Sequence, residues 1–443
     1  GAERALKQTL GELAQRFAQL RSPEFRDLWR DVEGIGSALL ARLHGDADRL
    51  VGVEPGDILV ARSVTIRDVI DLCAAGAAAL VLEEGSLTSH VVVLCRSAGL
   101  AAVSGVRGAL EAIDDETFLF VDGDAGVVLV GEAARSRRNT EASAPTTAPQ
   151  AEPPSPAASR LVDETGRAIV LRANLDIDLD ADRARRLGAD GVGLWRTFYL
   201  YLGRETVPSE DELAAIFAGT LAEFAPAIVT VRLLDLSGPF AERELPHELR
   251  GLGDCRGVRL MEQRPEVMDT QLRALMRASA AGRLRILLPF VSELEEITSI
   301  AARARFHADD LGVAMPQIGV MIEVPAILMQ IDDVAAASDF LAVGSNDLTA
   351  LLLARSRDAP SARSDTGAPA VLFEAIRRVV EAGERHGVSV SICGEIASQP
   401  MHAAALLASG LREFSIAPRL MPTMRAAMAV ALGSAARNRE LLG

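Results

Sequence analysis

From residue 163 onward, short apolar runs alternate with helical stretches, and this rhythm restricts the folds open to the chain. Eight of the runs are rich in Val, Ile and Leu, as strands buried on both faces are. We expect strands at residues 168–174, 191–196, 228–235, 284–290, 318–324, 340–347, 388–395 and 414–418. Eight strand–helix units in about 280 residues fit a TIM (β/α)8 barrel.

Polar residues stand at or near the ends of most of these runs. They are Asn174, Arg196, Arg232, Asp235, Glu323, Asn346, Asp347, Cys393 and Glu395. The carboxyl ends of barrel strands meet on one face, which carries the active site in barrel enzymes. The sequence therefore predicts an α/β barrel enzyme.

Two carboxylates, Glu323 and Asp347, end consecutive runs. Such a pair suits Mg²⁺, which accepts few protein ligands and keeps water and substrate oxygens. Each carboxylate taken alone could instead cap the following helix or pair with a basic residue.

Four arginines fall on the strands or in the loops after them: Arg196, Arg232, Arg256 and Arg357. Guanidinium groups bind phosphate and carboxylate bidentately and neutralise charge during phosphoryl transfer. Together with the two carboxylates they indicate a small, multiply anionic substrate, although any one arginine could form a solvated ion pair. Cys393 is either an inert buried thiol or a general acid or base.

The region before the barrel is expected to form three parts. Apolar stripes predict a helical segment over residues 1–48, and alternating strands and helices predict a compact α/β domain with a mixed sheet over residues 49–132. Residues 133–162 are expected to be a flexible linker, because residues 133–160 are rich in Pro, Ala, Ser and Thr and contain no large apolar side chain. The barrel then occupies residues 163–443.

His90 stands in GSLTSH (residues 85–90), where a predicted strand passes into a helix. A capping or core role is one interpretation of this histidine. The other is a nucleophile, since a neutral imidazole can attack a phosphoryl group when its second nitrogen is oriented by a neighbour such as Thr88.

Composition excludes several partners. The formal net charge is −15, which disfavours nucleic acid and anionic membrane surfaces. The four cysteines form no CxxC pair, so we expect reduced thiols and a cytoplasmic setting. No apolar run of 18 or more residues predicts membrane insertion. Because the chain begins at Gly1, we expect an upstream part to be missing.

Several motifs resemble one family. ANLD, GADGVGLWRT, VRLLDLSG, GDCRGVRL, IGVMIEVPA, VGSNDLT and SICGE follow the order of phosphoenolpyruvate-utilising barrels, and GSLTSHVVVLCR resembles the phosphohistidine motif of their swivelling domain. The likeness is greatest to Enzyme I of the bacterial sugar phosphotransferase system. RDLWRDVEGIGSALLARL resembles the end of the helical region that binds the carrier protein HPr, most of which we expect to be absent.

The resemblance implies a role for each matching residue. It implies that phosphoenolpyruvate phosphorylates His90, that the phosphoryl group passes to a histidine of HPr or a homologue, and that pyruvate is released. It further implies that Arg196, Arg232, Arg256, Arg357 and Asn346 bind the substrate, that Glu323 and Asp347 bind Mg²⁺, and that Cys393 protonates the enolate. A homodimer formed through the barrel is also implied.

The chain departs from the family pattern at several positions, among them an NPxLG motif that is replaced around Arg250–Asp254. Ser86 and Leu87 replace a glycine and a usually polar residue, Phe198 replaces a glutamate, and Phe240 replaces a lysine. One alternative is a relative of the dikinases and phosphoenolpyruvate synthases, against which the lack of a glycine-rich ATP-grasp segment argues. The other is a degenerate paralogue that binds phosphoenolpyruvate and regulates without turnover.

Overall fold

The computed structural model describes residues 53–440, and the gaps in the description matter for the site. The gaps are residues 65, 85–90, 92–94, 96–99, 124, 144–160, 177–178, 203, 237–244, 253–254 and 355–368. The expected helical segment over residues 1–48 lies outside the described residues, as do Ser86, Leu87, Thr88, His90, Phe240 and Arg357.

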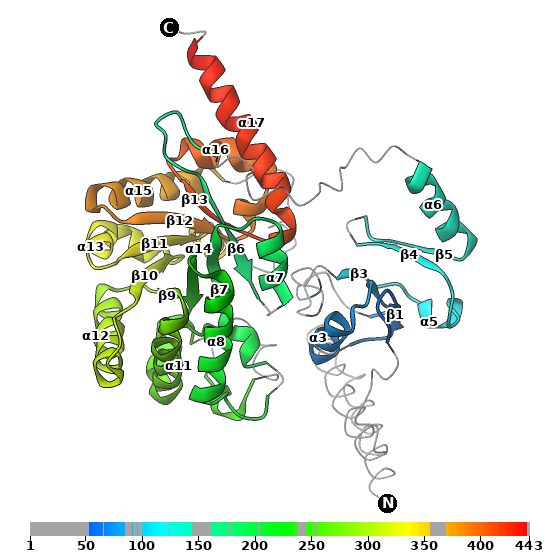
Figure 1. The fold of residues 1–443 in the computed structure, drawn as a ribbon, viewed down its shortest axis with the longest axis horizontal. Coiled ribbons are helices and arrows are strands. Elements are labelled where there is room, and N and C mark those ends of the chain that lie inside the picture. Colours follow the sequence, from blue (N-terminus) through cyan, green and yellow to red (C-terminus); the bar gives the residue numbers. More distant parts are fainter. Residues whose placement is uncertain are drawn as a thin grey trace, which may run out of the picture.

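Eight parallel strands close into a barrel, which confirms the predicted TIM-barrel fold. Around the barrel the strand order is β10-β11-β12-β13-β6-β7-β8-β9 (Figure 1). The strands are β6 (Val170–Leu175), β7 (Gly191–Arg196), β8 (Ile228–Arg232), β9 (Arg283–Leu288), β10 (Gln317–Ile322), β11 (Phe340–Gly344), β12 (Ser389–Cys393) and β13 (Glu413–Ile416). Each of them falls on one of the eight predicted runs.

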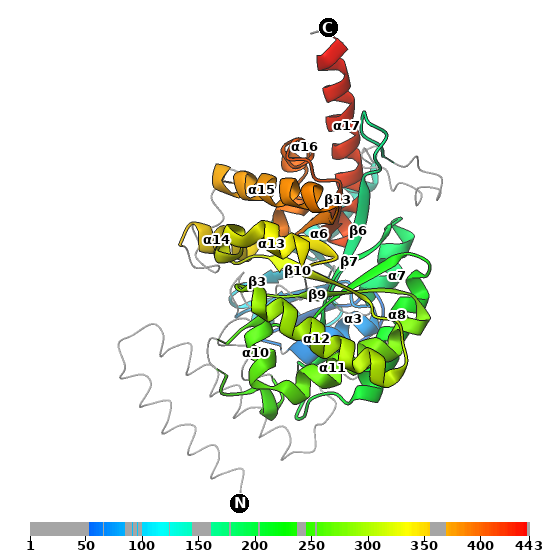
Figure 2. The same ribbon diagram turned by 90° about the vertical axis from the view of Figure 1, so that its left-hand side faces the viewer.

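Helices cover the outside of the barrel, with α11 against α12 and α13 against α15 (Figure 2). They are α7 (Leu179–Arg186), α8 (Glu210–Phe224), α10 (Gly257–Gln263), α11 (Pro265–Ala278), α12 (Leu294–Leu311), α13 (Ile331–Ala336), α14 (Ser345–Leu352), α15 (Ala370–His386), α16 (Ala403–Ala408) and α17 (Met421–Glu440). Local sequence sets several of their ends. Ser209 caps α8, and a capping box between Glu293 and Glu296 begins α12.

The interior of the barrel is filled by side chains rather than hollow. Leu194, Leu287, Met321, Phe340, Ala342 and Cys393 form a buried cluster inside it. At the amino end of the strands, the carboxylate of Glu413 lies 2.5 Å from Arg172 and 3.9 Å from Arg285. The guanidinium of Arg285 also covers the ring of Phe340 at 4.8 Å. The amino end of the barrel is therefore closed by packed charged and aromatic groups.

The smaller domain contains the predicted strands, but in two sheets rather than one mixed sheet. The first sheet is parallel, with β1 (Ile58–Ala61), β2 (Ala79–Leu82) and β3 (Ala101–Ser104), and α3 (Ile66–Ala75) connects β1 to β2. The second sheet is an antiparallel hairpin of β4 (Leu119–Asp122) and β5 (Val127–Val130). Asp122 ends β4 and accepts a hydrogen bond from Ala125 N at 2.8 Å, which favours a tight turn and local pairing. The short helix α5 (Ala109–Ala112) precedes this hairpin.

The predicted linker is partly helical, which corrects the expectation for residues 133–162. Helix α6 (Glu132–Ser143) covers the first part of that range. Ala134 is fully buried. Arg135 lies 6.0 Å from the ring of Phe118, just before β4, and Arg137 lies 6.0 Å from the ring of Phe120 in β4. Packing against this hairpin therefore stabilises a helix whose polar composition had predicted a tether. Within the part of the chain that the structure describes, no helix has the length and apolar character needed to cross a membrane.

Candidate active site at the barrel mouth

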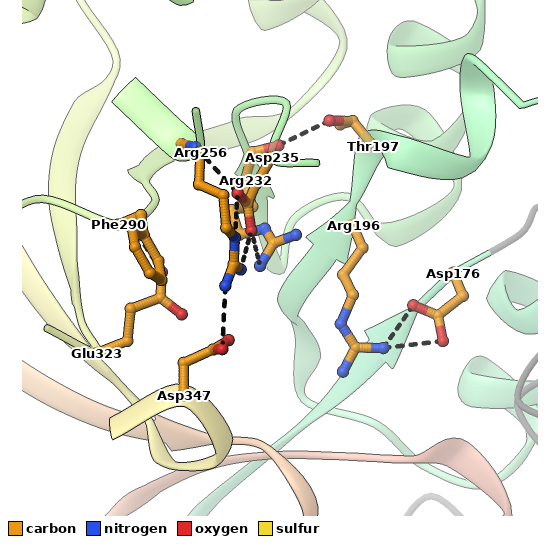
Figure 3. A network of polar contacts seen from close by, with 10 residues as sticks. Asp176, Arg196, Thr197, Arg232, Asp235, Arg256, Phe290, Glu323 and Asp347 are labelled. Carbon is orange, nitrogen blue, oxygen red and sulfur yellow. Dashed lines mark hydrogen bonds and ion pairs between the residues drawn. The ribbon is translucent and has the colours of Figure 1, made fainter. Parts of the chain in front are cut away.

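The carboxyl ends of the barrel strands bring the predicted site residues together (Figure 3). Arg196 and Arg232 are the last residues of β7 and β8, Cys393 is the last of β12, and Glu323 directly follows β10. Asp347 lies in the first turn of α14. Parallel strands place their carboxyl ends on one face, so residues far apart in the sequence become neighbours.

Asp235 is the centre of the polar network. Its carboxylate accepts hydrogen bonds from Arg256 Nη2 at 2.8 Å, Arg256 Nε at 3.3 Å and Gly257 N at 2.9 Å. Arg232 Nη1 lies 3.5 Å from the same carboxylate. A buried anion of this kind offsets the repulsion between two neighbouring guanidinium groups. Asp235 therefore holds two of the predicted substrate arginines side by side.

Arg256 makes two further contacts across the mouth. Its Nη1 donates to Asp347 Oδ1 at 3.1 Å, and its guanidinium covers the Phe290 ring at 4.1 Å. Phe290 has a left-handed backbone, with φ at 56°, which is uncommon for a bulky residue and is characteristic of functional sites. In this conformation Phe290 N donates to Glu323 Oε1 at 2.7 Å. Phe290 thus supports both Arg256 and Glu323.

Glu323 is almost completely buried, and burial raises its pKa to about 7, with a further contribution from the charge of Asp235. A group in this environment gains from a nearby cation that favours its charged form. The described residues contain no cluster of three or more His, Cys, Asp or Glu side chains that could hold a metal. Two carboxylates nevertheless fit Mg²⁺, which binds through one or two carboxylates together with substrate oxygens and water.

Arg196 is held separately from the other arginines, by Asp176. Arg196 Nη1 donates to the two carboxylate oxygens of Asp176 at 2.7 and 3.0 Å. The negative charge of Asp176 raises the pKa of Arg196 above its already high value. Figure 3 shows the Arg196 guanidinium turned toward Asp176 and away from the network around Asp235. Asp176 therefore fixes the orientation of Arg196.

Arg232 contains an unsatisfied donor. Its side chain is 11% exposed, and its Nε is buried without a hydrogen-bond partner among the described residues. A buried donor of this kind costs free energy unless a ligand or water accepts from it. Located beside Arg256 at the mouth, it is the donor that an anionic substrate would satisfy.

Asn346 and Cys393 complete the site. Asn346 Oδ1 accepts from Glu395 N at 2.9 Å, which joins the start of α14 to the segment after β12. Cys393 Sγ donates to Val343 O at 3.4 Å. Burial, followed by the charge of Glu323, raises the pKa of the thiol to about 12. Cys393 is therefore protonated at neutral pH, which suits a proton donor and not a thiolate nucleophile.

The structure brings together seven of the ten predicted site residues, while His90, Thr88 and Arg357 lie outside the described part of the chain. Phe198, at the position of the family glutamate, packs edge-on against Tyr199 with ring centroids 5.6 Å apart. Sequence reasoning missed the roles of Asp176, Asp235 and Phe290. Asp235 carried a signal, because it follows Arg232 by three residues in the same predicted run.

A parallel barrel with arginines and carboxylates at the carboxyl ends of its strands defines a barrel enzyme for a small anionic substrate. Comparison with known families is more specific. Residues 155–432 match the family described as "PEP-utilising enzyme, PEP-binding domain", and residues 53–126 match "PEP-utilising enzyme, mobile domain". The chain belongs to the PEP-utilising enzymes, where PEP is phosphoenolpyruvate.

Three relatives illustrate the similarity. A phosphoenolpyruvate-protein phosphotransferase of Haloferax volcanii is 34% identical over 97% of this chain and 76% of its own length. A protein of the same name from Cupriavidus necator is 32% identical over 94% of this chain and 75% of its own. A multiphosphoryl transfer protein of Xanthomonas campestris pv. campestris is 34% identical over 95% of this chain and 51% of its own.

Proposed function

We propose that this chain is a phosphoenolpyruvate–protein phosphotransferase. It moves the phosphoryl group of phosphoenolpyruvate to His90 and then to a histidine of a carrier protein such as HPr, with release of pyruvate, in sugar phosphotransfer. The names of its relatives support this activity, since they are similar over nearly the whole chain.

The observation that carries the proposal is the buried, unpartnered Nε of Arg232 beside Arg256. Phosphoenolpyruvate carries a phosphate and a carboxylate on three carbons, so it presents several acceptors to such donors. Arg232 and Arg256 bind these oxygens and offset the charge of the transferring group. Arg196, Arg357 and Asn346 complete the proposed substrate contacts.

Glu323 and Asp347 are the residues that would hold Mg²⁺. When bound, the ion would neutralise charge on the phosphoryl oxygens. Asp347 has a second function in the proposal, because it accepts a hydrogen bond from Arg256. If Asp347 held Mg²⁺ instead, Arg256 would be available to the substrate.

Two further groups act on either side of the substrate. His90 accepts the phosphoryl group through a neutral ring nitrogen, while Thr88 orients the imidazole. Loss of the phosphoryl group leaves the enolate of pyruvate. Cys393, protonated at neutral pH, donates a proton to its methylene carbon.

The direct test is to incubate the purified chain with Mg²⁺ and ³²P-labelled phosphoenolpyruvate. We expect label on the protein that is labile in acid and stable in alkali, as phosphohistidine is. The label should be lost in His90→Ala and retained in His386→Ala, a control at an exposed histidine paired with Asp332. Absence of His90-dependent label from the folded protein would contradict the proposal. Calorimetric binding of phosphoenolpyruvate without label or pyruvate would instead support a regulatory paralogue.

We also propose that the chain forms a homodimer through its barrel and acts in the cytoplasm. The four cysteines form no disulfide in the described part of the chain, which agrees with a reducing compartment. Sedimentation equilibrium of the purified protein tests the dimer, and a monomer at micromolar concentration would contradict it.

A further inference from the structure

Gln271 is a fully buried amide on α11, outside every motif that the sequence displays. Glutamine is seldom buried unless its amide is hydrogen-bonded. Here Gln271 Oε1 accepts from Leu234 N at 2.9 Å, and Gln271 Nε2 donates to Thr197 Oγ1 at 3.0 Å. The side chain thus connects the residue after Arg196 with the segment after Arg232.

The hydrogen bonds around Gln271 have one consistent direction. Because Leu234 N is a donor, the amide oxygen must face it, and the NH₂ group must face Thr197. The Thr197 oxygen accepts this bond, so its own proton is available to the backbone carbonyl of Arg232 at 3.0 Å. The chain of donors therefore runs from Gln271 through Thr197 to Arg232.

This network begins where the hydrogen bonding between β8 and β9 ends. Leu233 N still donates to Leu287 O of β9 at 3.0 Å, but Leu234 N donates to Gln271 instead. The next residue is Asp235, the carboxylate that holds Arg256 and Gly257 N. Gln271 accordingly fixes the backbone on both sides of Leu233, at Arg232 and just before Asp235.

We propose that Gln271, acting through Thr197, is a positioning residue that sets Arg232 and Asp235 for substrate binding. The inference rests on the proposed function, because it concerns the same substrate site. Gln271 does not contact the arginine head groups itself. It controls the path of the backbone that follows β8, at residues 233–235. Small displacements of binding groups strongly lower the rates of enzymes.

Three variants of the full chain test this role. Gln271→Met keeps the side-chain length but removes both hydrogen bonds, and Thr197→Val removes the hydroxyl while leaving Gln271 in place. We expect each to weaken phosphoenolpyruvate binding, measured by calorimetry with Mg²⁺, by about tenfold. Thr197→Ser keeps the hydroxyl and should bind nearly as the wild type does. The affinity of the double variant Gln271→Met/Thr197→Val for phosphoenolpyruvate should equal that of the single variant that binds more weakly, because the two side chains act as one unit.

A matched control separates positioning from general destabilisation. Val267→Ala opens a small cavity on the same helix, at a buried position, and should lower the melting temperature without changing affinity. Equal affinity in Gln271→Met and the wild type, with only the melting temperature lowered as in Val267→Ala, would overturn the proposal. Equal weakening in Thr197→Ser and Thr197→Val would also overturn it.

Hydrogen–deuterium exchange of the ligand-free proteins gives an independent measurement. We expect faster exchange of the Leu234 amide in Gln271→Met and unchanged exchange in Val267→Ala. Unchanged exchange in Gln271→Met would contradict the proposed role of Gln271. A wild-type protein that does not bind phosphoenolpyruvate would instead contradict the proposed function. The exchange result would still decide whether Gln271 fixes the backbone that follows β8.

Discussion

The guanidinium of Arg256 lies 3.1 Å from the carboxylate of Asp347, so two groups proposed for different ligands satisfy each other. Arg256 is proposed to bind substrate and Asp347 to bind metal. A cation near Asp347 must compete with this arginine, whereas a substrate anion near Arg256 must compete with this aspartate. The two ligands should therefore bind cooperatively, because each one releases the group that the other needs.

This pairing predicts that Arg256→Gln binds Mg²⁺ more tightly than the wild type when phosphoenolpyruvate is absent. Removing the positive charge of Arg256 near Glu323 and Asp347 should raise the affinity for Mg²⁺ about tenfold, which corresponds to roughly 1.4 kcal/mol. Calorimetric titration with MgCl₂ measures the change. Arg259→Gln, which breaks an ion pair between Arg259 of α10 and Glu296 of α12, is the control and should leave the affinity for Mg²⁺ unaltered. Weaker Mg²⁺ binding in Arg256→Gln would contradict the competition.

The pKa of Glu323 predicts a pH-dependent stability. The pKa of about 7 means that the folded protein retains this proton up to about pH 7, whereas the unfolded chain releases it near the ordinary glutamate pKa of 4.5. Over that interval the folded state binds more protons, so the free energy of unfolding falls as the pH rises, by up to about 3 kcal/mol at roughly 1.4 kcal/mol per pH unit. Glu323→Gln lacks this titration.

Thermal unfolding in EDTA between pH 5 and pH 8 measures the effect as the difference between the wild type and Glu323→Gln. The wild type should lose more stability than the variant as the pH rises. Added Mg²⁺ should stabilise the wild type more at pH 8 than at pH 5, because the ion competes with the proton. Parallel pH curves for the two proteins would show that Glu323 is not the titrating group.

Cys393 is predicted to act as a neutral acid. Cys393→Ala should retain phosphoenolpyruvate binding but form pyruvate at least about a hundredfold more slowly, as expected when a general acid is removed. With the thiol pKa raised to about 12, no thiol titration should appear in the rate below pH 10. Stopped-flow measurement of pyruvate formation across this pH range tests both statements. Cys255→Ala, at a partly exposed cysteine on the loop before α10, is the control.

The charged cluster at the amino end of the barrel is predicted to matter for stability and not for binding. Glu413→Gln leaves Arg172 and Arg285 together without their shared carboxylate, which should lower the free energy of unfolding by about 3 kcal/mol. Glu384→Gln, which breaks an exposed pair with Arg167, should cost no more than about 1 kcal/mol. Urea unfolding compares the two variants. A change in phosphoenolpyruvate affinity in Glu413→Gln would contradict the separation of the cluster from the site.

The barrel could be predicted because strands buried on both faces require continuous apolar runs, and these runs differ clearly from the amphipathic helices between them. Helix α6 could not be predicted, because its composition is polar and its stability comes from contacts with Phe118 and Phe120, at the start of the β4–β5 hairpin. Tertiary packing overrides weak intrinsic propensity in such cases.

The site was predictable where a polar residue interrupts or ends an apolar run, as Arg232 and Glu323 do. Asp176 and Gln271 were missed for a physical reason. Their partners, Arg196 and Thr197, lie 20 and 74 residues away in the sequence, so no local pattern reveals the contacts. Only the closed barrel brings them together.

The packed amino end of the barrel has a consequence for the order of events. That end is filled, among the described residues, by Arg172, Arg285, Glu413 and Phe340. In the proposed function, small molecules are therefore exchanged through the carboxyl-end mouth. In the proposed reaction the histidine that receives the phosphoryl group uses this same opening. If both use one opening, we expect pyruvate to leave after the phosphorylated histidine has withdrawn and before a new substrate enters.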